Sequence, residues 1–156
     1  MVQSKRLRRL DWLFTREPIY FVTVCAADRH RIFATERVHR AFISFARAGI
    51  DCGAFVGCYV IMPDHIHLFV ALDPEKVTLS AWVKSLKNHL SKELRNSGEP
   101  SPHWQKGFFD HVLRSGESYE EKWQYVLQNP VRARLVNELE KWPFQGEINT
   151  LDFRRS

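Results

Sequence analysis

The stretch that decides the fold is Met62-Pro63-Asp64-His65-Ile66-His67-Leu68-Phe69-Val70. Pro63-Asp64 predicts a tight turn, and the residues that follow have the β-branched and aromatic composition of a strand. Because successive side chains of a strand point to opposite faces, His65 and His67 share one face, and Ile66 and Leu68 share the other. We therefore expect a hairpin strand with an apolar face toward the core. Its other face would carry two imidazoles that can both ligate one metal ion.

Apolar periodicity on both sides of this hairpin predicts the other elements. Strands are expected at residues 19–25, 55–62, 65–72 and 108–113, and helices at 38–49, 79–95 and from 118 to a break at Pro130, followed by a short helix to about 136. Ser118 and Glu121 have the spacing of a capping box at the start of the third helix.

The order β-α-β-β-α-β followed by a helix is the split β-α-β, ferredoxin-like arrangement of an α+β protein. Such a fold has an antiparallel sheet with helices on one face, here with an added C-terminal helix. The other sheet face, which carries His65 and His67, is expected to be open to a ligand.

The length of 156 residues favours a single domain, with a core at about 15–145, a basic N-terminal arm and a short C-terminal tail. The formal charge of +5 and the sequence pI of about 9.3 favour an anionic partner. Basic residues concentrate in residues 1–16 and 84–95, a pattern that suits a phosphate backbone but is also found on ordinary solvated surfaces. The candidate DNA contacts are Arg6, Arg8, Arg9, Lys84, Lys87, Arg95 and Arg132.

Three cysteines without a metal-type spacing are typical of reduced thiols in a cytosolic protein. The basic N-terminus is not followed by an unbroken apolar segment, which argues against a signal peptide. No apolar run approaches the length of a membrane helix. We therefore expect a cytoplasmic protein with no membrane partner.

The third helix presents a tyrosine away from its buried side. Its buried stripe is formed by Tyr119, Trp123, Val126 and Leu127. At about 100° per residue, Tyr125 lies roughly 145° from the middle of this stripe. Asn129 follows one turn later, so both side chains can reach one spot. An amide oxygen is a suitable third ligand for a hard divalent ion beside the two histidines.

A metal ion held by His65, His67 and Asn129 beside a phenol would form a nucleophilic site. The metal would polarise a phosphodiester, and Tyr125 would attack the phosphorus to form a covalent intermediate. Taken singly, a His-x-His pair is weak evidence for a metal, and a helix tyrosine is more often a surface or packing residue. The combination with basic clusters favours this chemistry.

Three sequence blocks, in this order, resemble those of one protein family. They are the histidine–hydrophobe–histidine block at 62–68, Trp104-Gln105-Lys106-Gly107-Phe108-Phe109-Asp110-His111-Val112-Leu113-Arg114, and Tyr125-Val126-Leu127-Gln128-Asn129-Pro130-Val131-Arg132-Ala133-Arg134-Leu135-Val136. The chain resembles the HUH single-strand nucleases and, among them, the REP-associated tyrosine transposases of the IS200-like transposase family. Asn129-Pro130 after the tyrosine favours the REP-associated branch.

The resemblance implies a metal-dependent single-stranded DNA endonuclease and strand transferase that acts on palindromic hairpins through a 5′-phosphotyrosine, with a tetranucleotide on the 5′ side. It implies Mg²⁺ or Mn²⁺ held by His65, His67 and Asn129, and Tyr125 as the nucleophile. DNA transposition and recombination are the implied processes, in a bacterial, nucleoid-associated protein. A monomer is expected, although a dimer remains an alternative.

Two other classes of function stay open at this point. One is a non-cleaving DNA-binding protein derived from a transposase, although such a protein need not keep His65, His67 and Tyr125 together. The other is an unrelated small hydrolase or cupin, which would need further ligands that the strand 55–62 does not offer. For His111, a structural role is favoured.

Overall fold

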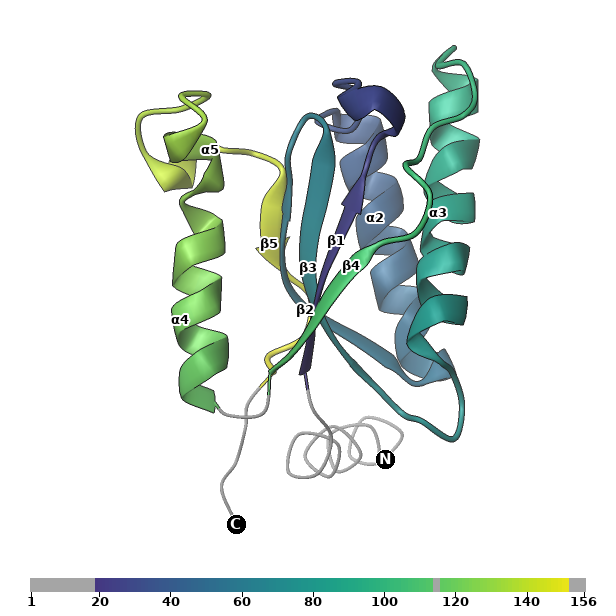
Figure 1. Cartoon of the computed structure of the whole chain (residues 1–156), viewed down its shortest axis with the longest axis vertical. Helices are drawn as coiled ribbons and strands as arrows, with labels where there is room; N and C mark the ends of the chain where they lie inside the picture. The colour runs from purple at the N-terminus through teal and green to yellow at the C-terminus, as the bar shows by residue number, and fades with distance from the viewer. Residues whose placement is uncertain (1–18, 114–115, 152–156) are drawn as a thin grey trace.

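The structure, a computed structural model, describes residues 19–113 and 116–151. A five-stranded antiparallel sheet stands between helices on its two faces (Figure 1). The strands are β1 (Ile19–Cys25), β2 (Ala54–Ile61), β3 (His65–Leu72), β4 (Phe109–Leu113) and β5 (Gln145–Glu147). The helices are α2 (Glu36–Ala48), α3 (Leu79–Asn96), α4 (Gly116–Leu127) and α5 (Asn129–Arg132), with short 3-10 turns η1 (Ala27–Arg29), η2 (Gly49–Cys52) and η3 (Leu139–Lys141).

The strand order β4-β1-β3-β2-β5 confirms the predicted ferredoxin-like arrangement. β3 lies between β1 and β2 and is antiparallel to both, so α2 is the crossover between two parallel strands. β2 and β3 form the predicted hairpin, which is closed by the Met62 amide donating to the His65 carbonyl at 2.8 Å. β5 was not predicted; it adds to the outer edge of β2.

One face of the sheet packs against α2 and α3. Both helices begin at a threonine, Thr35 and Thr78, whose hydroxyl accepts an amide hydrogen from the first turn. The side chains of Ile66, Leu68 and Val70 are fully buried in this core, as the strand alternation predicts. Large helix residues that close it are Phe42, Trp82, Leu86 and Leu90.

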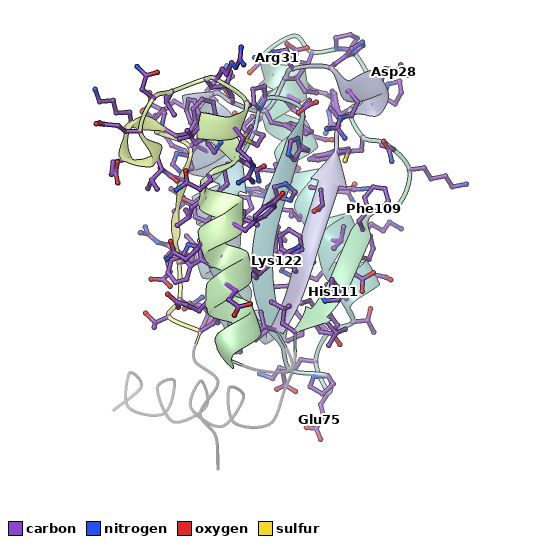
Figure 2. All side chains as sticks on the ribbon, turned by 60° about the vertical axis from the view of Figure 1, so that its left-hand side comes forward. Asp28, Arg31, Glu75, Phe109, His111 and Lys122 are labelled. Atoms are coloured by element: carbon purple, nitrogen blue, oxygen red, sulfur yellow. The ribbon has the colours of Figure 1, made fainter. Side chains whose placement is uncertain are left out.

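The opposite face is not open along its length, which corrects the sequence-based expectation. α4 lies over it (Figure 2), and Tyr119 and Val126 of this helix are buried in a second core. The physical reason is that the strand residues here are also apolar: Phe69 of β3 is fully buried and meets Tyr119 edge to face, with ring centroids 5.0 Å apart. A helix has to cover them.

The C-terminal helices differ from the prediction at their ends. α4 begins at Gly116, so Ser118 lies inside its first turn and is not at the N-cap position. The predicted break is confirmed, because α4 ends at Leu127 and α5 begins at Asn129 with a proline in its first turn. α5 ends at Arg132, before the expected residue 136. Arg134 has a positive φ of 60°, which is incompatible with a right-handed helix at that position.

All three cysteines are free, and two of them are buried in β1 and β2. In the described ranges, no helix has the length and apolarity that a membrane crossing requires.

Candidate active site

The two histidines lie on the α4 side of β3, as predicted. Their ring centroids are 4.6 Å apart and the ring planes meet at 76°. The antiparallel register places His65 opposite Cys25 and His67 opposite Thr23 of β1. Both side chains are half-buried.

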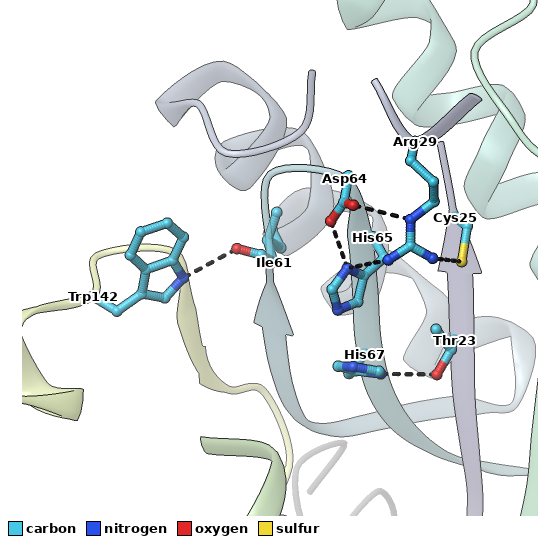
Figure 3. A network of polar contacts seen from close by, with 8 residues as sticks. All are labelled: Thr23, Cys25, Arg29, Ile61, Asp64, His65, His67 and Trp142. Carbon is cyan, nitrogen blue, oxygen red and sulfur yellow. Dashed lines mark hydrogen bonds and ion pairs between the residues drawn. The ribbon is translucent and has the colours of Figure 1, made fainter. Parts of the chain in front are cut away.

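His65 is held by a carboxylate that is itself held by an arginine (Figure 3). Nδ1 of His65 lies 2.7 Å from Oδ1 of Asp64, and Nε of Arg29 donates to Oδ2 of the same carboxylate at 2.9 Å. A carboxylate only accepts hydrogen bonds, so Nδ1 carries the proton and Nε2 has the lone pair. Nη2 of Arg29 also lies 3.4 Å from Nδ1. Since both of these nitrogens carry a hydrogen, this contact is not a hydrogen bond.

The surroundings of Asp64, Arg29 and His65 determine the charge that each of them carries. Burial acts to raise the pKa of Asp64, but the hydrogen bonds from His65 and Arg29 outweigh it, and the pKa lies below its usual value. The hydrogen bond to Asp64 raises the pKa of Arg29. Burial lowers the pKa of His65 despite the neighbouring carboxylate. Near neutral pH, a neutral imidazole is therefore held between Asp64 and the open side of the site.

His67 is fixed from β1. Its Nδ1 is 2.8 Å from the hydroxyl of Thr23, and its ring stacks on Phe21 with centroids 5.3 Å apart. Burial is the largest cause that lowers its pKa, and together with the charges of His65, Lys122, Arg132 and Arg29 it brings the pKa to about 3. Among the described residues, neither histidine uses Nε2 in a hydrogen bond. A neutral imidazole is the form that binds a metal; His65 presents the Nε2 lone pair, and His67 presents it when its Nδ1 donates to the Thr23 hydroxyl.

Tyr125 is on the exposed side of α4, as the helical wheel predicts. Its side chain is 61% exposed, whereas Val126 next to it is buried. Two cations lie against its ring: Cζ of Arg132 is 4.0 Å and Nζ of Lys122 is 5.9 Å from the ring centroid. Cations beside the phenol can attract the phosphate that a nucleophile must reach.

Asn129 begins α5, one turn beyond Tyr125, and is half-buried. Its Oδ1 accepts a hydrogen bond from Nη2 of Arg132 at 3.0 Å. Arg132 therefore links the amide to the tyrosine ring. An amide oxygen has two lone pairs, so one remains for another partner.

The donors present fit a divalent ion only with help from the substrate or water. In the described part of the chain, no three His, Cys, Asp or Glu side chains cluster so that they could hold a metal alone. The two imidazoles form an incomplete set, and the Asn129 amide oxygen, phosphate oxygens or water would have to complete it.

The segment after α5 is fastened to the hairpin that carries the histidines. The indole Nε1 of Trp142 donates to the carbonyl of Ile61 at 3.0 Å (Figure 3). The Ile61 amide donates to the Phe144 carbonyl at 2.8 Å. Ile61 is the last residue of β2, just before the turn that leads to His65. These bonds attach the tyrosine-bearing end of the chain to the histidine-bearing hairpin.

The candidate DNA contacts are not brought together. Arg6, Arg8 and Arg9 lie outside the described residues. Lys84 and Arg95 are exposed on α3, across the sheet from the histidines, and their role stays a prediction. Lys87 donates to the carbonyls of Gln105 and Gly107 at 3.2 and 2.6 Å, so it anchors the loop before β4. Arg132 is at the site, beside Tyr125.

Sequence reasoning missed four side chains that shape this site: Thr23, Arg29, Asp64 and Lys122. Lys122 precedes Tyr125 by three residues, which is a helical spacing that could have indicated a shared face. Asp64 directly precedes His65. Thr23 depends on the β1–β3 register, and Arg29 depends on a 3-10 turn in which Asp28 and Arg29 have φ values of 52° and 55°. No local pattern signals either of these two.

Tyr125 and the histidine pair lie on the same side of the sheet, because Lys122 of α4 lies over the Tyr125 ring and over the Phe21 ring on which His67 stacks. A family model described as "Transposase IS200 like" matches residues 16–129, and the chain belongs to this family.

Several relatives are REP-associated tyrosine transposases. The Escherichia coli K12 protein of that name is 23% identical over 127 residues, covering 80% of this chain and 73% of its own. A Haemophilus influenzae protein, provisionally given the same name, is 23% identical over 143 residues, covering 85% and 81%. The expected resemblance to the REP-associated branch is confirmed.

Solved structures share the fold. One is a REP-associated tyrosine transposase bound to a REP hairpin, with a TM-score of 0.63 and 23% identity, covering 82% of this chain and 75% of that one. Another is a provisionally assigned transposase from Deinococcus radiodurans, with a TM-score of 0.52 and 16% identity, covering 70% and 88%.

Proposed function

We propose that this protein is a metal-dependent single-stranded DNA endonuclease and strand transferase that acts on hairpin DNA through a 5′-phosphotyrosine. The observation that carries the proposal is the state of the histidine pair. Asp64 and Thr23 occupy the Nδ1 atoms of two neutral imidazoles, and the Nε2 atoms remain for a metal on the side of the sheet where Tyr125 is exposed.

The phenol oxygen of Tyr125 attacks the phosphorus of a phosphodiester. A new O–P bond forms, the P–O3′ bond breaks, and the 5′-phosphate stays on the tyrosine. The phenol gives up its proton and the departing 3′-oxygen takes one up, so the proton balance closes. Exposure of Tyr125 matters here, because the attacking oxygen has to approach the phosphorus opposite the leaving group.

Lys122 and Arg132 stabilise the phosphate as its charge builds up. Both lie against the Tyr125 ring, and Lys122 also lies over the Phe21 ring on which His67 stacks. A bound Mg²⁺ or Mn²⁺, held by His65, His67 and Asn129, would supply Lewis-acid polarisation of the phosphodiester. The chain's own part is to position the phosphate between these cations and Tyr125.

Strand transfer is the same step in reverse. A 3′-hydroxyl attacks the phosphotyrosine, the tyrosine leaves as the phenol, and a phosphodiester is restored. The covalent bond preserves the energy of the cleaved linkage, so joining needs no nucleotide cofactor.

Hairpin DNA is the proposed substrate because a relative with the same fold is bound to a REP hairpin. The basic charge of the chain is consistent with a nucleic acid partner. The second candidate, a non-cleaving DNA-binding protein, would use the same cations but leave Tyr125 idle.

Cleavage of end-labelled hairpin oligonucleotides separates the two. Purified protein is incubated with Mn²⁺, with Mg²⁺ or with a chelator, and the products are run on a denaturing gel. We expect a protein–DNA adduct and a fragment with a free 3′-hydroxyl, only when a metal is present. Tyr125→Phe is the matched control and should bind DNA but form no adduct. Binding without cleavage by the wild-type protein would favour the second candidate.

A further inference from the structure

β4 carries an exposed aromatic side chain on the face where the histidines lie. In the antiparallel register, Phe109 is opposite Thr23 and His111 is opposite Phe21. Directly paired residues point to the same face, so Phe109 and His111 lie on the side of Thr23, Phe21 and His67. Figure 2 shows Phe109 and His111 along β4, with Lys122 on the neighbouring α4. We call Phe21, Phe109 and His111 the aromatic strip.

The exposure of this strip is uneven along the strand. Leu113, at the end of β4, is buried, whereas His111 is exposed and Phe109 is 61% exposed. His111, for which the sequence favours a structural role, is thus exposed and does not pack in the core. Among the described residues, the large apolar or aromatic side chains that are strongly exposed are Phe109 and Tyr125. One is the candidate nucleophile, and the other is Phe109, which stacks on no aromatic ring in the described part of the chain.

The strip is continuous with the candidate active site. The ring of His67 stacks on Phe21 at 5.3 Å with an interplanar angle of 24°. Nζ of Lys122 lies 5.0 Å above the same phenylalanine ring. Phe21 is therefore in contact with a histidine of the site on one side and borders β4 on the other, with a cation above it.

This combination matches the chemistry of an unpaired nucleic acid strand. Bases stack on aromatic rings whatever their sequence, and lysine pairs with the phosphates between them. β4 is two strand spacings, or about 10 Å, from β3. At about 3.4 Å per stacked nucleotide, the strip lies within about three nucleotides of a phosphate held at the histidines.

We propose that the aromatic strip stacks the unpaired bases adjacent to the cleaved phosphodiester, with Phe109 as the principal stacking residue and Lys122 binding the phosphate between strip and site. This rests on the proposed function. It assigns single-stranded DNA, and not a second copy of the chain, to the exposed face of β4.

The test compares two DNA hairpins, one with single-stranded extensions on both sides and one without. All variants are made on the Tyr125→Phe background, so that binding is measured without cleavage. Phe109→Ala should weaken binding to the extended hairpin by about 5- to 150-fold, which is the effect of losing one stacked base, and leave the blunt hairpin unaffected. Phe109→Trp should preserve the preference for the extended hairpin.

Asp110→Asn is the matched control, because Asp110 is exposed on the same strand but pairs with Val22 and points to the opposite face. It should leave the ratio of the two affinities unchanged. 2-Aminopurine placed at successive positions of the extensions should be quenched next to the cleavage position, and Phe109→Ala should relieve that quenching.

An unchanged affinity ratio in Phe109→Ala overturns the inference, while adduct formation by the wild-type protein leaves the proposed function standing. If Phe109→Ala instead converts a dimer to a monomer in sedimentation velocity, the strip is an interface between copies and the inference is also overturned. If the wild-type protein neither binds nor cleaves either hairpin, the proposed function fails and the inference falls with it.

Discussion

Removing the Asp64 carboxylate should weaken the metal site without unfolding the protein. Nδ1 of His65 and Oδ1 of Asp64 are 2.7 Å apart, the distance of a charge-assisted hydrogen bond, which contributes about 1.5–3 kcal/mol. The Asp64 side chain is 26% exposed and that of Arg29 is 54% exposed, so their ion pair adds less than about 1 kcal/mol. The carboxylate thus acts mainly on the orientation and tautomer of the His65 ring.

We expect Asp64→Ala to lower Mn²⁺ affinity by about 10- to 100-fold, the usual effect of losing a carboxylate that orients a metal-binding histidine. Isothermal titration with Mn²⁺ measures it, at neutral pH and again at higher pH. Burial already keeps the pKa of His65 low, and losing Asp64 lowers it further, so a lost proton cannot explain a weaker site. Raising the pH should therefore not restore affinity.

Glu36→Ala is the matched control for Asp64→Ala. Glu36 also pairs with an arginine, Arg40, but both side chains are exposed on α2, away from the histidines. If both variants lose equal affinity, the effect is the loss of a negative charge from the whole protein. If Asp64→Ala binds Mn²⁺ as tightly as the wild-type protein, Asp64 does not orient His65 and the reasoning is refuted.

Three other substitutions test separate parts of the site. Tyr125→Phe should abolish the covalent adduct on a denaturing gel and change the free energy of unfolding by less than about 0.5 kcal/mol, because the side chain is exposed. Lys122→Ala should slow cleavage and reduce the slope of log affinity against log salt by about 0.7; an unchanged slope would exclude a phosphate contact. His67→Gln should flatten the acid dependence of stability. The folded pKa of about 3 lies below the usual 6.5, so between these pH values the unfolded state binds one more proton than the folded state. The free energy of unfolding of the wild-type protein therefore decreases as the pH is lowered through this range, by at most about 1.4 kcal/mol per pH unit. Denaturant melts at several pH values measure this dependence. If the free energy of unfolding changes equally with pH in His67→Gln and in the wild-type protein, His67 is not held neutral in the folded state.

Local patterns were sufficient for some parts of the site. The two-residue period of a strand placed His65 and His67 on one face, and the helical period placed Tyr125 away from Val126. Both are properties of a single element, and neither depends on how elements pack. The order of strands and helices was likewise enough for the ferredoxin-like topology.

Contacts between distant elements could not be predicted in this way. Thr23 reaches His67 only because the β1–β3 register pairs them across 44 positions in sequence. Arg29 reaches Asp64 from a turn with positive φ values that ordinary residues rarely adopt. β5 is the three-residue segment Gln145–Glu147, which has no strand pattern and pairs because β2 offers it an edge.

The proposed chemistry of this site depends on two separate parts of the fold. β1, β3 and η1 organise the histidines, whereas α4 and α5 carry Tyr125 and Asn129. Their relative position is set by apolar packing of Tyr119 and Val126 on the sheet and by the bond from Trp142 to the end of β2. The second core is therefore more than a cover for apolar strand residues. Because it holds Tyr125, the proposed nucleophile, to the histidine side of the sheet, a change in this packing would alter the reach of Tyr125 while leaving His65 and His67 in place.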